Sequence, residues 1–109
     1  MPTAYKVLAQ AAPAATTNTD IYTVPANTQT VISTIVVANR AATAATFRIA
    51  VRPNGAAIAN QHYIAYDVTV GASDSTTITS GITVDAADVI TVYGSTANLS
   101  FNAFGSEIS

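Results

Sequence analysis

The chain contains no cysteine, and charged residues make up only 9% of its 109 residues. Without cysteine there can be no disulfide bond, thiolate zinc site or cysteine nucleophile. An average soluble protein has about 25% charged residues, so a surface this poor in charge indicates contact with other subunits. Four basic residues and a net charge of −2 argue against nucleic acid as a partner, which requires clustered Lys and Arg.

Targeting segments and long apolar runs are missing as well. The first residues, MPTAYKVLAQAAPAA, do not combine a basic region with an apolar run, so we expect no signal peptide. Polar residues such as Ser33 and Arg40 interrupt the stretch VISTIVVANRAATAA, so we expect no transmembrane segment and no membrane partner. Neither a phosphate-binding loop nor a dinucleotide glycine pattern occurs, so we expect no cofactor.

The sequence does contain short runs of Val, Ile, Thr, Tyr and Phe separated by Gly, Pro, Asn and Asp. This spacing is typical of an all-β protein. About eight short strands predict a single antiparallel β-sandwich or jelly-roll-like domain over residues 20–109. An extended N-terminal arm over 1–19, rich in Ala and Thr, is expected to become ordered on a neighbour. The predicted strands are 4–9, 20–24, 29–38, 46–52, 62–70, 76–84, 89–93 and 98–104.

The strands 46–52 and 62–70 predict an antiparallel hairpin whose partner numbers sum to 115. In this register Arg48 lies opposite Asp67, and Arg52 lies opposite Tyr63. The other face is apolar and pairs Phe47 with Val68, Ile49 with Tyr66, and Val51 with Ile64. Arg48, Arg52, Tyr63 and Asp67 therefore form a candidate interaction surface that could bind a sugar or a carboxylate. The alternative is a solvated or subunit-contacting sheet face.

The run TVISTIVVAN is apolar on both faces of a strand. Val31, Ile35 and Val37 share one of these faces by alternation. A strand of this kind is either buried on both sides or faces a neighbouring subunit. We therefore include these three residues in the candidate interaction surface.

Three residues invite a chemical interpretation. His62 is the only histidine, but alternation sends Asp67 to the opposite face, so we expect a loop-edge histidine and not a catalytic base. Asp85 and Asp88 could hold a cation or act as paired carboxylates. Their DAAD sequence between two apolar runs is typical of a turn. We expect no catalytic residue and no metal site.

The runs YTVPANTQTVISTIVVANRAATAATFRIAVRP and HYIAYDVTVGASDSTTITSGITVDAADVITVYGSTANLSFNAFGSEIS resemble a family of small β-rich tailed-phage virion proteins. The resemblance covers roughly residues 20–108 and depends on strand and turn texture, including YTVPA, YIAYD and TVYGSTANLSF. It implies a non-enzymatic component of the phage particle, and the family offers no catalytic positions to transfer.

The expected function is a capsid decoration, or cement, protein that bridges and stabilises capsid subunits on the particle surface. Its partners would be the major capsid protein or other virion proteins, and family analogy suggests a homo-oligomer, with a trimer first. Two alternatives stay open. One is an adaptor associated with the tail, baseplate or fibre, and the other is a host-receptor or carbohydrate-binding module.

Overall fold

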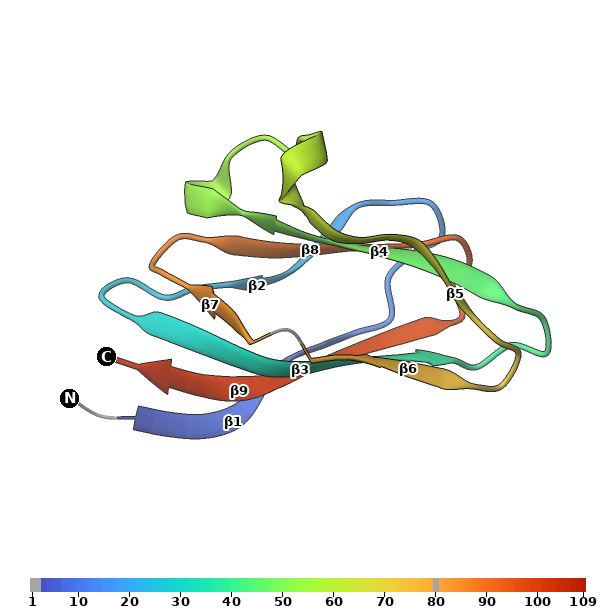
Figure 1. Cartoon of the computed structure of the whole chain (residues 1–109), viewed down its shortest axis with the longest axis horizontal. Coiled ribbons are helices and arrows are strands. Elements are labelled where there is room, and N and C mark those ends of the chain that lie inside the picture. Colours follow the sequence, from blue (N-terminus) through green and yellow to red (C-terminus); the bar gives the residue numbers. More distant parts are fainter. Residues whose placement is uncertain (1–2, 80) are drawn as a thin grey trace.

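The described part of the chain forms nine strands, which are arranged in two antiparallel sheets that pack face to face (Figure 1). This computed structural model describes residues 3–79 and 81–109. The loop over residues 53–62 forms two short 3-10 turns at Pro53–Gly55 and Asn60–His62. The strands are β1 (Thr3–Ala11), β2 (Thr19–Thr23), β3 (Gln29–Asn39), β4 (Ala45–Arg52), β5 (Tyr63–Val70), β6 (Ser75–Ile78), β7 (Ile82–Val84), β8 (Val89–Gly94) and β9 (Leu99–Ile108).

The strand order is that of a jelly roll. The larger sheet has the order β1-β9-β3-β6, with β7 also paired to β3, and the smaller sheet has the order β2-β8-β4-β5. Since β6 and β7 both pair with β3, they act together as one interrupted strand. The pairs β1–β9, β2–β8, β3–β6/β7 and β4–β5 then match the first strand with the last, the second with the next to last, and so on. This arrangement confirms the predicted all-β sandwich of jelly-roll type.

Residues that alternate along the strands of both sheets form one core between the sheets. Its two largest side chains, Phe47 of β4 and Phe101 of β9, are fully buried, and their rings meet edge to face at 6.2 Å. Apolar side chains from both sheets surround this pair. Aromatic edge-to-face contacts add to the burial term, so Phe47 and Phe101 join the two sheets at the centre of the sandwich.

Two predicted segments differ from the structure. The predicted strand 76–84 is divided into β6 and β7, and Gly81, before β7, has a φ of 62° that an extended strand does not accommodate. The predicted strand 4–9 is confirmed as part of β1, but β1 lies at the edge of the larger sheet and pairs with β9, so residues 3–11 of the predicted arm join the sheet of their own chain. Residues 1 and 2 of that arm, and residue 80 of the predicted strand 76–84, lie outside the described residues.

Candidate functional site

The outer face of the smaller sheet brings together the predicted polar residues of the hairpin. Arg48 Nε donates to Asp67 Oδ1 at 2.7 Å, and Arg48 Nη2 reaches Asp67 Oδ2 at 3.4 Å. The predicted pairing of these two residues is therefore confirmed. The hydrogen bonds to Asp67 are the main cause that raises the pKa of Arg48 above its ordinary value.

The rest of the predicted hairpin register is wrong beyond Phe47 and Val68. β5 contains irregularities between Tyr63 and Val68, so that Ile49 lies opposite Ala65 and Ala50 lies opposite Tyr63. Asp67 has a φ of 51° at the first of them. Such bulges turn the following side chains to the other face. The predicted inward pair, Ile64 and Tyr66, is consequently exposed by 43% and 56%.

Because Tyr66 turns outward, Arg48 lies between two aromatic rings. Its guanidinium carbon is 4.2 Å from the centroid of Tyr66 on β5 and 4.3 Å from the centroid of Tyr93 on β8. Tyr63 packs edge to face on Tyr66, with 4.9 Å between the ring centroids. Cation–π contacts of this kind stabilise exposed sheet faces. Arg48, Asp67, Tyr63, Tyr66 and Tyr93 are called the arginine–tyrosine cluster below.

The predicted pairing of Arg52 with Tyr63 is wrong, since Tyr63 lies opposite Ala50. Arg52 instead takes part in a separate hydrogen-bond network. Its Nη2 lies 2.9 Å from Asp20 Oδ1, and its Nε donates to Thr91 Oγ1 at 3.0 Å. Thr91 in turn donates to Asp20 at 2.7 Å. Arg52 Nη1 donates to the carbonyl of Ala56 at 2.9 Å. Arg52 thus fastens the loop after β4 to the centre of the smaller sheet.

Sequence reasoning missed Tyr66, Tyr93, Asp20 and Thr91 as members of this face. Alternation could have identified Tyr93 and Thr91, because Ile90 and Val92 on the same strand are core residues. No local signal connects Asp20 to Arg52. The order β2-β8-β4 brings them together.

His62, Asp85 and Asp88, the residues considered above for catalysis or metal binding, form hydrogen bonds that hold turns. His62 Nδ1 accepts a hydrogen bond from the backbone N–H of Ala59 at 3.0 Å and closes the second 3-10 turn. Asp88 accepts from the backbone N–H of Asp85 at 2.8 Å and of Asn54 at 2.7 Å. The DAAD segment is therefore a turn, as the sequence predicted, and the structure adds that Asp88 also holds the loop after β4.

This turn contains a strained residue that offers a stability test. Ala87 has a φ of 71°, a conformation that side chains with a Cβ rarely adopt. We expect Ala87→Gly to raise the free energy of unfolding by about 0.5–1 kcal/mol, measured by urea unfolding. Ala86→Gly is the matched control in the same turn, and it should lower stability. If Ala87→Gly destabilises as much as Ala86→Gly, the conformation assigned to Ala87 is wrong.

The outer face of the larger sheet contains the predicted apolar residues only in part. A bulge between Ile32 and Thr34 on β3 reverses the alternation. Val31 remains at the surface, whereas Ile35 and Val37 are completely buried in the core. This corrects the placement of Ile35 and Val37 in an interaction surface, because a neighbour cannot reach them.

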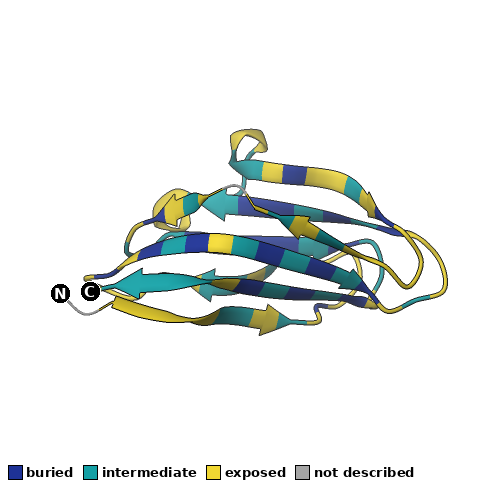
Figure 2. Ribbon diagram, turned by 60° about the horizontal axis from the view of Figure 1, so that its bottom comes forward, coloured by how far each residue is buried: buried dark blue, intermediate teal, exposed yellow. Residues whose placement is uncertain are grey.

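Other apolar side chains are exposed on this outer face beside Val31. Tyr5 and Val7 of β1 are exposed by 85% and 48%, and Phe104 of β9 by 36%. Tyr5 and Val31 flank Ser106 in one row across the sheet, and Val7 lies opposite Phe104 in the next. Figure 2 shows that β1, at the sheet edge, is exposed along most of its length. Tyr5, Val7, Val31 and Phe104 are called the apolar patch below.

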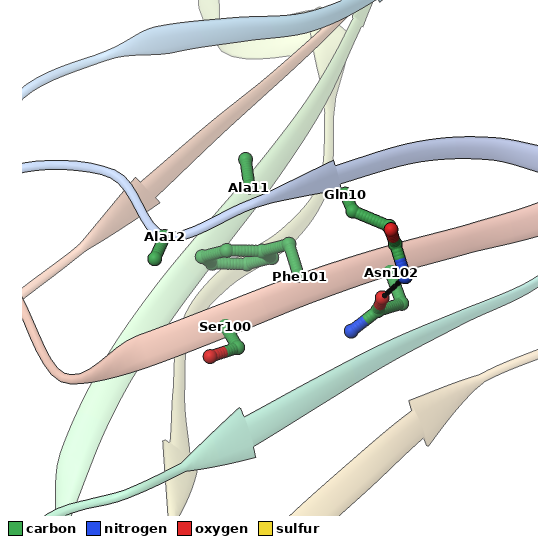
Figure 3. A pocket seen from close by; sticks show the side chains of 6 residues that line it. All are labelled: Gln10, Ala11, Ala12, Ser100, Phe101 and Asn102. Carbon is green, nitrogen blue, oxygen red and sulfur yellow. Dashed lines mark hydrogen bonds between the residues drawn. The ribbon is translucent and has the colours of Figure 1, made fainter.

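Two open hollows flank strand β9. The first, about 380 Å³, lies where β1 ends beside β9 (Figure 3). Gln10 Nε2 donates to Asn102 Oδ1 at 2.8 Å there, and the Phe101 ring lines the hollow together with Ala11 and Ala12. The second, about 500 Å³, lies within the apolar patch. No charged side chain lines the first hollow, whereas Lys6 is on the rim of the second.

A polar network between the sheets holds the end of β9. Glu107 Oε1 is 2.9 Å from Lys6 Nζ on β1, and Glu107 Oε2 accepts a hydrogen bond from the Tyr22 hydroxyl. Tyr22 also shares a hydrogen bond of 2.8 Å with Thr30. The hydrogen bond from Tyr22 and then that from Lys6 lower the pKa of Glu107. Burial, followed by the hydrogen bond to Glu107, raises the pKa of Tyr22 to about 12.

This network predicts a stability maximum with an acid and an alkaline limb. The pKa of Glu107 is lower in the folded state than in the unfolded state. Its contribution to the free energy of unfolding is therefore complete above about pH 4.3, and it is lost as the pH falls through the pKa of the folded state. Because the pKa of Tyr22 is higher in the folded state, its contribution is lost as pH rises from 10 towards 12. Urea unfolding across pH measures both limbs. Glu107→Gln should weaken the acid limb and Tyr22→Phe the alkaline limb, and unchanged profiles would contradict the network.

Among residues 3–79 and 81–109, no cluster of three or more His, Cys, Asp or Glu side chains could hold a metal ion. The same residues include no helix with the length and apolar character needed to cross a bilayer. The charged groups of the smaller sheet's outer face are paired with each other. A search of protein-family models, curated proteins and solved structures found no match to this chain.

Proposed function

We propose that the chain is a non-enzymatic structural component of a tailed-phage particle and acts as a capsid decoration protein. One observation carries the proposal. In the described parts of β1, β3 and β9, the outward positions hold no charged side chain, while Tyr5, Val7 and Phe104 are exposed. An exposed apolar patch of this kind marks a contact surface for protein.

The remaining surface agrees with this role. Arg48 pairs with Asp67 and Arg52 with Asp20, so the charges of the smaller sheet satisfy each other instead of projecting towards a ligand. The jelly roll also occurs in viral capsid proteins, although a fold alone does not determine a function. Binding through the apolar patch would bridge neighbouring capsid subunits, and the area buried would oppose the outward pressure of packaged DNA.

Quantitative mass spectrometry of purified particles tests this proposal. A decoration protein should be present in a copy number comparable to that of the major capsid protein. A copy number comparable to that of tail proteins would instead favour the adaptor role. Absence from washed particles would contradict both roles.

Loss of the protein should also weaken the particle. Particles that lack it are expected to release DNA at a lower temperature, and addition of the purified chain should restore their resistance. Tyr5→Ser should restore it poorly, whereas Tyr66→Ser, at an exposed tyrosine of the other outer face, should restore it fully. Equal rescue by both variants would show that the apolar patch is not the contact surface.

The arginine–tyrosine cluster favours a second candidate, a receptor- or carbohydrate-binding module. The Tyr66 ring is 56% exposed beside Arg48 and Asp67, and exposed aromatic rings next to polar groups can stack on sugars. A glycan array with the wild-type chain and with Tyr66→Ala tests this role. Binding that Tyr66→Ala abolishes would establish it, and no binding by the wild type would exclude it for the sugars present.

A further inference from the structure

The apolar patch combines a projecting side chain with a hollow that could receive one. On β9 the second hollow is lined by Phe104, Gly105 and Ser106, and Tyr5 and Val31 lie on either side of Ser106. The resulting space of about 500 Å³ is large enough for an aromatic side chain. Tyr5 is 85% exposed at its rim, so it has few contacts within its own chain.

Charge decides what kind of partner fits this face. The one charged side chain at the rim, Lys6, is paired with Glu107 at 2.9 Å. A partner with a charged contact surface would lose hydration here without gaining an opposite charge. A second copy of the same face brings no unpaired charge and supplies the apolar area that the patch lacks. A second copy is therefore the occupant with matching chemistry.

We propose that two copies of the chain associate through the apolar patch about a twofold axis, with Tyr5 of each copy in the hollow of the other. In a twofold contact each residue pair occurs twice. One projecting side chain and one hollow on the same face are therefore enough to form both halves of the interface. Tyr5 of one copy would cover Ser106 and Val31 of its partner. Aromatic side chains that fill a pocket at the centre of an interface dominate its affinity. This association is that of the free chain in solution; on a particle the capsid protein would take the place of the second copy on the same patch.

Sedimentation velocity over a concentration series tests the dimer in solution, apart from any particle. The wild-type chain should show a monomer–dimer equilibrium. Tyr5→Ser should raise the dissociation constant at least about 30-fold. Ser106→Phe should weaken the dimer comparably, because it fills the hollow from its floor while Tyr5 remains. Thermal melting monitored by circular dichroism verifies that each variant is folded.

Tyr66→Ser is the matched control, since it makes the same change at an exposed tyrosine of the other sheet. It should leave the dissociation constant unchanged. A chain that stays monomeric at every concentration, or that forms trimers, would overturn the twofold contact. A dimer weakened by Tyr66→Ser and not by Tyr5→Ser would place the interface on the other face. None of these three results would change the copy number measured on particles, so the two proposals fail independently.

Discussion

Phe101→Ala is expected to lower the free energy of unfolding by about 3–5 kcal/mol. Phe101 is fully buried, and it contacts Phe47 of the opposite sheet edge to face at 6.2 Å. Its removal would leave a cavity where the two sheets meet, in addition to the lost burial of an aromatic ring. Urea unfolding followed by circular dichroism measures the change.

Phe104→Ala provides the control on the same strand. Phe104 lies on the outer face of β9 and is 36% exposed, so its loss should cost below about 1 kcal/mol. If Phe101→Ala does not fold, Phe101→Leu should still cost about 1–1.5 kcal/mol. Equal effects at Phe101 and Phe104 would mean that the assignment of inner and outer faces on β9 is wrong.

Gly105→Ala is the second substitution with a large expected effect, at about 3 kcal/mol. A Cβ at Gly105 would lie 1.9 Å from the carbonyl oxygen of Val31 and 3.0 Å from Ile32 Cα. Both atoms belong to the backbone of β3, just before its bulge. The clash can be relieved only by moving β3 away from β9, which weakens the hydrogen bonds of the larger sheet.

Gly71→Ala is the matched control for this change. A Cβ at Gly71 would meet its nearest neighbour, Asp74 Oδ2, at 3.7 Å, which is an ordinary contact. We expect a stability within about 0.5 kcal/mol of the wild type. A wild-type stability for Gly105→Ala would show that the close approach of β9 and β3 does not exist.

The fold class could be predicted from the sequence because the strands carry their own signals. Runs of β-branched and aromatic residues predict eight strands that cover all nine in the described residues, with β6 and β7 in one run, and glycine, proline and aspartate mark the turns. The division of 76–84 into β6 and β7 was not predicted. The Ser-Gly pair at 80–81 was the available turn signal in that run, and the φ of 62° at Gly81 interrupts the strand there.

The candidate site could be predicted less well because bulges change which face a residue occupies. Arg48 and Asp67 were paired correctly since opposite charges on adjacent strands select a register. The irregularities of β5 then moved Tyr66 outward, and the bulge of β3 moved Ile35 and Val37 inward. A bulge depends on contacts with neighbouring strands, and strict alternation cannot anticipate it.

The placement of β1 also depends on contacts between strands that the sequence does not reveal. The sequence of residues 3–11 matches an extended segment, but it does not say whether that segment joins its own sheet or a neighbour. In this chain the segment joins its own sheet, because it pairs with β9 and because Lys6 forms an ion pair with Glu107. The apolar patch exists only because of that pairing, since Tyr5 and Val7 come from β1 and Phe104 from β9.

An electron cryomicroscopy map of the intact particle tests most directly whether this chain works by joining surfaces. The account predicts jelly-roll density on the outside of the capsid in many copies, with Tyr5, Val7 and Phe104 buried against another polypeptide. A map in which the domain is absent from the particle, or in which these three side chains face solvent in every copy, would contradict it.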